Sequence, residues 1–280
     1  MSRRLARLQA LDQRLSDRDR RLVQEVVRLR FLTTGQLERL AFHAVEAPVT
    51  RARRTRRQLA RLVELDLLWR LERRIGGVRA GSTGYVYAAT AEARRLDAWL
   101  LTEPLTRAQA DHEPGATFVE HSVACSELFV RLVEADRTAE LELLEHQAEP
   151  ACWRRFLGPM SGVRHLRPDA FVRLGLGAWE QLAFIEVDRG SEGTAALARK
   201  LELYVAYWRS GIEQDQRGVF PKVVWLTTTD RGVRLLRREL ARLPNDAQVI
   251  FAVTDFERAL HELRDEGADP TAMSSVGGVS

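Results

Sequence analysis

The sequence of 280 residues has only two cysteines and no apolar run long enough to cross a membrane. Cys125 and Cys152 do not form a C-x-x-C pair, so a disulfide framework is not indicated. A spanning helix needs about 18 or more apolar residues, and the amphipathic start MSRRLARLQALDQRL lacks the continuous apolar stretch of a secretory signal. These absences predict a cytoplasmic protein that does not enter membranes.

Motifs of several enzyme classes are also missing. No G-x-x-x-x-G-K-[ST] loop occurs, which argues against work driven by ATP. No H-x-H cluster or tyrosine pair points to a relaxase that uses a metal–histidine centre and a tyrosine nucleophile. The histidines are scattered, at His43, His112, His121, His146, His165 and His261. Cysteine catalysis lacks a matched base as well.

Charge is divided unevenly along the chain. The composition, 45% hydrophobic and 29% charged, is that of a globular protein with enough apolar material for real cores. Residues 1–100 carry a net charge of about +11, whereas residues 101–280 carry about −7. Such a division suggests a first half that contacts nucleic acid and a chemically different second half. Two solvated surfaces of opposite sign are the plain alternative.

The first hundred residues have the element order of a winged helix-turn-helix. Apolar spacing predicts helices over 16–33, capped by Ser16 or Asp17, over 33–42, capped by Thr33 or Thr34, and from a cap at Thr50 onward. From 67 to 73 the period approaches two, which predicts a strand, and a glycine-rich turn leads to a second strand at 85–90. The hairpin would be the wing, and the third helix the one that enters DNA.

Arginines crowd the first half of that third helix and the tip of the wing. Arginines so close together repel one another and oppose the helix dipole unless anions such as phosphates neutralise them. The predicted DNA-binding residues are Arg51, Arg53, Arg54, Arg56, Arg57, Arg61 and Arg79. A solvated arginine-rich helix without a ligand is the alternative. The segment 3–15 could also provide a helix contact in a homodimer.

We expect a winged-helix domain at 1–100, a linker at 101–117, a second domain at 118–266 and a disordered tail at 267–280. In the second domain, periodicity predicts a helix at 119–137, strands at 141–150, 165–174 and 181–190, then a helix, a strand, a helix, a strand and a closing helix. This order gives a mixed sheet between helices. The fold class is therefore α/β, or α+β over the whole chain.

Three carboxylates fall where a core is expected. Glu186 and Asp188 lie two apart on one apolar strand and so project from the same face, while Ile185 and Val187 fill the other. Asp169 begins the preceding strand and could lie beside them. Carboxylates gathered in a half-buried place resist ionisation, and a hard divalent cation such as Mg²⁺ removes that difficulty. Alternatively, Asp169 caps a turn while arginines at 167, 189 or 199 pair with the other two acids.

The pattern P-D, then E-x-D at a strand end followed by a helix, resembles the PD-(D/E)xK nuclease superfamily. The chain from about residue 20 to 230 resembles the replication-relaxation family of plasmids and mobile elements. The stretches that carry this likeness include RRQLARLVELDLLWRLERR, PGATFVEHSVACSELFVRL, RPDAFVRL, FIEVDRGSE and RKLELYVAYWRSG. The resemblance implies a winged helix followed by a restriction-endonuclease-like domain, related to plasmid mobilisation relaxases that nick DNA.

The resemblance also implies roles for particular residues. Asp169 and Glu186 would hold Mg²⁺ or Mn²⁺, and Asp188, which could also bind metal, stands where the superfamily has a lysine. An aspartate there supplies no positive charge, so Lys200 on the following helix could bring a cation to the site, unless it is an ordinary helix-edge lysine. The additional candidates, each with a solvated, paired or structural alternative, are Glu149, Glu120 and His121.

Three functions remain open at this point. The first is a metal-dependent DNA endonuclease or nickase, targeted by the winged helix to a plasmid or mobile element. The second is a non-catalytic initiator accessory or transcriptional regulator with a degenerate nuclease domain. The third is a protein that recruits other replication or mobilisation proteins to DNA. The missing motif lysine favours the second function, and the three retained acids favour the first.

Overall fold

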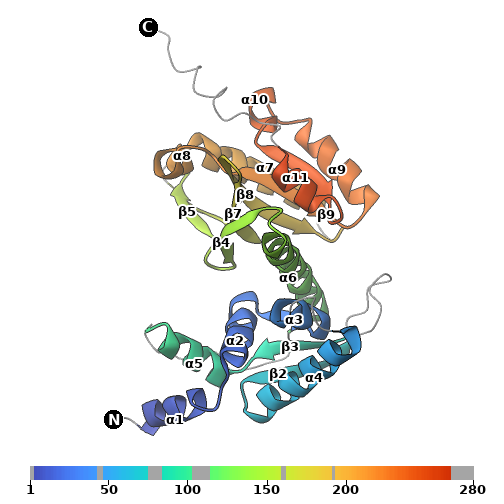
Figure 1. Ribbon diagram of the computed structural model, residues 1–280. Coiled ribbons are helices and arrows are strands. Elements are labelled where there is room, and N and C mark those ends of the chain that lie inside the picture. The colour runs from blue at the N-terminus through green and yellow to red at the C-terminus, as the bar shows by residue number, and fades with distance from the viewer. Residues whose placement is uncertain are drawn as a thin grey trace. The chain divides into compact units, whose positions relative to one another are not determined.

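A computed structural model gives the arrangement of the chain, and it describes residues 3–42, 47–74, 84–102, 114–158, 162–190 and 193–265. The chain divides into two compact units, Met1–Val130 and Arg131–Ser280. Figure 1 shows the helices and strands of both units. Among the helices within these ranges, none has the length and apolar character that a membrane span requires.

Unit 1 is built from helices and a three-stranded antiparallel sheet with strand order β1-β3-β2. Its elements are α1 (Arg3–Asp12), α2 (Asp17–Leu29), β1 (Phe31–Thr33), α3 (Thr34–Ala41), α4 (Pro48–Glu64), β2 (Leu68–Arg74), β3 (Tyr85–Ala89), α5 (Ala91–Leu100) and the first part of α6 (Ala116–Arg137). Three helices, α2 to α4, followed by the β2–β3 hairpin give the expected order of a winged helix-turn-helix. The short strand β1, inside the segment expected to be helical, was not foreseen.

Local capping explains where the helices of unit 1 begin. The Ser16 side chain accepts a hydrogen bond from the Asp19 backbone N–H, and Asp19 bonds back to Ser16, which is a complete capping box. Thr33 caps α3 in the same way. The expectation that Thr50 caps α4 is wrong, because the helix already begins at Pro48. Proline suits the first helical position, since its missing N–H would have no partner there.

Unit 2 contains a five-stranded mixed sheet with strand order β10-β9-β8-β7-β4. Strands β8, β9 and β10 are parallel, and β7 and β4 are antiparallel to their neighbours. The strands are β4 (Glu142–Ala148), β5 (Arg154–Leu157), β6 (Val163–Leu166), β7 (Ala170–Leu176), β8 (Trp179–Asp188), β9 (Lys222–Thr227) and β10 (Phe251–Asp255). The helices are α7 (Thr194–Arg209), α8 (Ile212–Arg217), α9 (Asp230–Leu240), α10 (Asn245–Gln248) and α11 (Ala259–Arg264).

Helices cover both faces of this sheet. On one face, Phe171, Phe184 and Trp225 pack with residues of α7 and α9 in one apolar core. On the other, Lys222 of β9 pairs with Glu262 of α11 at 2.8 Å. The mixed sheet flanked by helices confirms the predicted fold class.

The expected single strand at 165–174 is wrong. The chain forms β6, interrupts at Pro168 and Asp169, and resumes as β7. Among the residues that the structure describes, β6 pairs with β5 alone, and this separate two-stranded sheet was not predicted. Proline lacks a backbone N–H, so it is poorly suited to continue a paired strand. The interruption leaves Asp169 at the start of β7.

Candidate functional site

The site lies at the ends of two interior strands of the unit 2 sheet, where β8 ends and β7 begins. It contains Asp169, Glu186 and Asp188 and is called the acidic edge below. Ala170 pairs with Ile185, so Asp169, one residue earlier, lies beside Glu186. The Asp169 carboxylate accepts a hydrogen bond of 2.7 Å from the Val187 backbone N–H. Both Asp169 and Glu186 are buried, with exposed fractions of 9% and 0%. The strand alternation that the sequence predicts therefore brings these two acids together on one face.

Glu186 is held by two side chains of α7. The Tyr204 hydroxyl donates a hydrogen bond of 2.5 Å to Oε1, and Lys200 Nζ contacts Oε2. Burial, with a smaller contribution from the charge of Asp169, raises the pKa of Glu186 to about 8, although Lys200 opposes that rise. Burial and the neighbouring Glu186 also raise the pKa of Tyr204 well above its ordinary value. The cation beside Glu186 is thus Lys200, the lysine that the sequence analysis named on the helix following this strand.

Lys200 is reachable from solvent, since 24% of its side chain is exposed. Its ammonium lies 5.4 Å from the centre of the Trp225 ring. Lys200 and Tyr204 are four residues apart and therefore lie on one side of α7. Tyr204 was assigned to the apolar stripe of this helix, and its hydroxyl was not recognised as a partner of Glu186.

Asp188 and Glu149 lie near the same edge of the sheet. Asp188 is buried and accepts a hydrogen bond of 2.7 Å from the Gly190 N–H, which fixes one of its oxygens. Glu149 directly follows β4, where Ala148 pairs with Ala170, so the register places it next to Asp169. Burial and then the charges of Glu149 and Asp169 raise the pKa of the Cys152 thiol to about 12. A thiol so resistant to ionisation is unsuited to nucleophilic catalysis.

The chemistry of the donors fits a hard cation such as Mg²⁺ or Mn²⁺, because Asp169, Glu186 and Asp188 offer only carboxylate oxygens. Their spacing does not yet complete a site. In the portion of the chain that the structure describes, these three acids do not form a group with ligand atoms all within 4.8 Å of one another. Both oxygens of Glu186 also have a side-chain partner already, since Oε1 accepts a hydrogen bond from Tyr204 and Oε2 forms an ion pair with Lys200.

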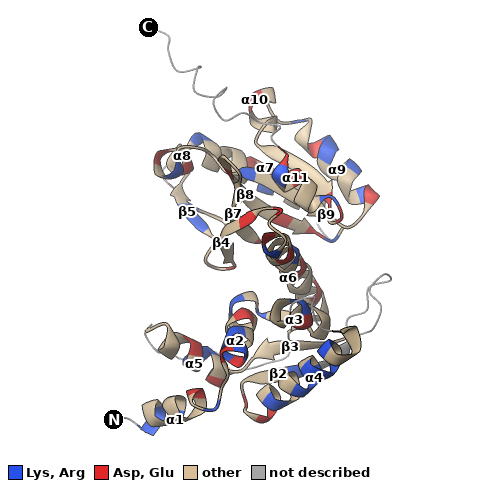
Figure 2. Cartoon of the chain, viewed as in Figure 1, with Lys and Arg blue, Asp and Glu red and all other residues tan. Residues whose placement is uncertain are grey.

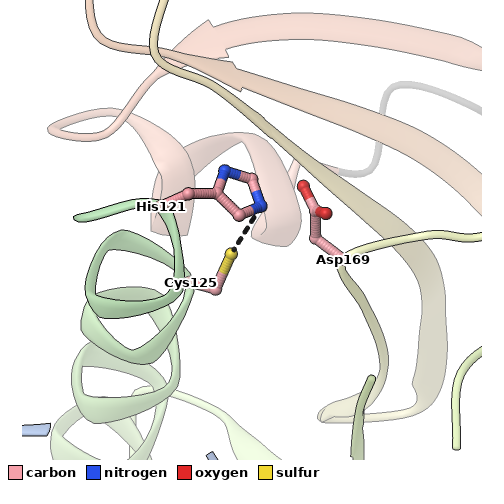
Figure 3. Close-up of side chains that lie close together, drawn as sticks. All are labelled: His121, Cys125 and Asp169. Atoms are coloured by element: carbon pink, nitrogen blue, oxygen red, sulfur yellow. Dashed lines mark hydrogen bonds between the residues drawn. The ribbon is translucent and has the colours of Figure 1, made fainter. Parts of the chain in front are cut away.

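Glu120 and His121 lie on the part of α6 that belongs to unit 1. His121 Nε2 lies 3.6 Å from the Cys125 sulfur, one helical turn further along (Figure 3). Both Glu120 and His121 are half-buried. Their assignment to the acidic site stays a prediction.

The arginines of α4 fall into two groups. Arg51 pairs with Glu38 at 2.7 Å, and Arg61 pairs with the buried Asp19 at 2.6 Å, so these two stabilise the fold of unit 1. The other four are exposed and give α4 a basic surface (Figure 2). These exposed α4 arginines are Arg53, Arg54, Arg56 and Arg57. Arg79, assigned to the tip of the wing, lies outside the described residues.

Asp19 anchors α4 to α2. Burial alone would raise its pKa, but hydrogen bonds from Ser16, Gln58 and Arg61 outweigh burial and lower it. Two of these partners, Gln58 and Arg61, lie on α4 and contact the two carboxylate oxygens at 3.0 and 2.6 Å. The carboxylate therefore holds the basic helix in place from within unit 1.

A winged-helix unit and a mixed-sheet unit with a buried acidic edge define a two-unit α/β protein. Residues 24–223 match the family described as replication-relaxation, and the chain belongs to this family. The resemblance to the replication-relaxation family is thereby confirmed. No curated protein and no solved structure was found to match the chain.

Proposed function

We propose that this protein binds DNA of a plasmid or mobile element through unit 1 and nicks it with a divalent metal ion at the acidic edge of unit 2. The contact between Lys200 and Glu186 is the observation that carries the proposal. The motif position expected to hold a lysine holds Asp188 instead. A lysine from α7 nevertheless reaches the neighbouring carboxylate, so the positive charge required for phosphodiester hydrolysis has a source in this chain.

Asp169 and Glu186 would hold Mg²⁺ or Mn²⁺, and Asp188 would complete the oxygen donors. A bound ion would activate water and offset negative charge at the phosphate. Lys200 would leave Glu186 when the ion binds and would then interact with the phosphate. Because a quarter of the Lys200 side chain is exposed, this movement requires no opening of the core.

DNA binding is assigned to the exposed α4 arginines. Their guanidinium groups suit phosphate oxygens, and each contact releases counterions, so binding would weaken as salt rises. The anchoring of α4 by Asp19 supports this assignment, because a helix held by a buried carboxylate presents its arginines in a fixed orientation. Membership of the replication-relaxation family suggests a role in plasmid or mobile-element replication or mobilisation.

A second function is a regulator or initiator accessory that binds DNA without cutting it. The observation in its favour is that Glu186 already has two partners, an ion pair with Lys200 and a hydrogen bond from Tyr204. A buried acid with two partners can serve the fold alone. In that case Asp169 and Glu186 would stabilise unit 2, and metal would have no effect on DNA.

Cleavage of supercoiled plasmid carrying the DNA that flanks this gene separates the two functions. The parent chain, Asp169→Asn and Lys200→Met are titrated with Mg²⁺ and Mn²⁺, and Glu202→Gln, an exposed position on α7, serves as the control. The proposal predicts open-circle product from the parent and the control, and loss of product in the other two variants. Equal DNA binding by all four proteins, without metal-dependent product from any, would establish the non-catalytic alternative.

A further inference from the structure

The β5–β6 hairpin of unit 2 presents a basic and aromatic surface directly beside the acidic edge. The chain leaves β4 at Ala148, forms the hairpin, and returns to β7 through Pro168 and Asp169. Residues 151–168 contain four arginines and neither aspartate nor glutamate, although residues 101–280 as a whole are acidic. The position beside the acidic edge and the local positive charge together favour binding of an anionic partner.

The inner side of this hairpin serves the fold. Phe156 and Leu166 are buried in the core of unit 2. Arg154 points the same way, pairs with the buried Glu213 at 2.7 Å and stacks near Phe184. These contacts hold strands β5 and β6 against the core and account for one of the four arginines.

The outer side has no such internal role. Arg155 and Arg167 are exposed, and neither forms an ion pair with a carboxylate that the structure describes. Arg164 is also exposed, but it pairs with Phe156 in the register and therefore projects from the inner side. The Arg167 guanidinium lies 4.8 Å from the centre of the Trp153 ring, and 38% of Trp153 is exposed. Arg155, Arg167 and the exposed indole of Trp153 form what is called the hairpin surface below.

Two apolar residues extend the hairpin surface. Leu157 and Val163 face each other across the two strands and are 68% and 46% exposed. Phosphates of a duplex would satisfy the arginines but would leave an indole and two aliphatic side chains in water. A single strand offers both phosphates and unstacked bases, and bases stack on aromatic side chains.

From this arrangement we infer that the hairpin surface binds single-stranded DNA next to the acidic edge. Trp153 stacks on a base, and Arg155 and Arg167 contact phosphates. The inference deepens the proposed nicking function and rests on it for its biological setting, since a strand held here would lie close to Asp169. Strand binding can nevertheless be measured without cleavage.

The test is fluorescence anisotropy with a labelled single-stranded oligonucleotide and with a duplex of the same sequence, in the absence of divalent metal. All proteins are full-length and carry alanine at the exposed α4 arginines, so that unit 1 contributes little to binding. The variants are Trp153→Ala, Trp153→Phe, and the combined Arg155→Glu and Arg167→Glu. The charge control changes exposed arginines of α9, Arg231→Glu and Arg234→Glu.

We expect single-strand affinity to fall about fivefold or more in Trp153→Ala, since stacking is removed, and to be preserved in Trp153→Phe. The double charge reversal should abolish binding, and its alanine counterpart should lower the salt slope by about 1.4, at about 0.7 for each phosphate that an arginine neutralises. The α9 control should bind as its background does. Thermal unfolding of each variant establishes that it is folded.

Unchanged single-strand binding by folded Trp153→Ala and double-reversal proteins would overturn the inference. An equal loss in the α9 control would also overturn it, because it would reduce the effect to net charge. A preference for the duplex over the single strand would show that the surface is a duplex contact instead. None of these results alters the plasmid assay, which reports cleavage rather than strand affinity, so failure of the inference and failure of the proposed function remain distinguishable.

Discussion

The buried Glu186 makes the stability of this protein depend on pH in a direction opposite to that of a carboxylate whose pKa is lowered by folding. Its pKa is about 8 in the folded state, compared with an ordinary value of 4.5. Because the folded state keeps the proton to a higher pH than the unfolded state, the stability from this group is full below the unfolded pKa. It is lost progressively as the pH rises through about 8.

The substitution Glu186→Gln removes this dependence. Glutamine has the shape of the protonated acid and can still accept the Tyr204 hydrogen bond, but it has no proton to lose. Each tenfold change in proton affinity corresponds to about 1.4 kcal/mol. The free energy of unfolding of the variant relative to the parent should therefore rise by roughly 4 kcal/mol from pH 5 to pH 9, with the variant the more stable at pH 9.

Urea unfolding at pH 5, 7 and 9, followed by tryptophan fluorescence, measures this difference in free energy. Trp225, buried 5.4 Å from Lys200, makes the signal sensitive to unit 2. Groups that titrate equally in both proteins cancel in the difference, and Glu202→Gln controls for the loss of one negative charge. A difference that stays constant from pH 5 to pH 9, or a parent more stable than the variant at pH 9, would refute the reasoning.

Three further predictions follow from the same structure. Changing the exposed α4 arginines to alanine should weaken duplex binding and lower the salt slope by about 0.9 for each phosphate that the variant no longer neutralises. Fluorescence anisotropy from about 50 to 200 mM salt measures the slope. An unchanged slope would contradict the assignment of DNA binding to α4. Asp19→Ala should destabilise unit 1 by about 2 kcal/mol, since Gln58 and Arg61 lose a buried partner. Because the pKa of Asp19 is lowered, that contribution is present at neutral pH and disappears in acid; equal urea midpoints for parent and variant at pH 7 would disprove it. Mn²⁺ should bind more tightly at pH 8.5 than at pH 6.5 and should release a proton from Glu186. Calorimetry in buffers of different ionisation enthalpy detects that proton. Binding that does not depend on pH would argue against Glu186 as a ligand.

Features governed by short-range rules could be predicted from the sequence. Alternation along β8 placed Glu186 and Asp188 on one face and Ile185 on the other, because the period of a strand is two. Ser16 and Thr33 were each one of two cap candidates read from the sequence, and they do cap α2 and α3, since capping is a local motif. The family resemblance pointed to the acids of the acidic edge and to their order along the chain.

Features that depend on distant residues could not be predicted in the same way. Arg61 was assigned to DNA because its helix is basic, but its partner Asp19 lies on another helix and is visible only after folding. Tyr204 falls on an apolar stripe, and periodicity does not show that its hydroxyl meets a buried acid. The four-residue strands β5 and β6 were missed because short strands carry too few alternations to separate from a loop.

The central claim is that Asp169 and Glu186 together hold a divalent ion at the edge of unit 2, and the most direct measurement is a count of bound Mn²⁺. Electron paramagnetic resonance reports free Mn²⁺ in solutions of the protein with a short oligonucleotide, compared with the oligonucleotide alone. The account predicts one additional ion bound per parent chain at pH 8.5, absent in Asp169→Asn and in Glu186→Gln and retained in Glu202→Gln. No additional ion on the parent chain, or equal binding by all the proteins, would contradict it.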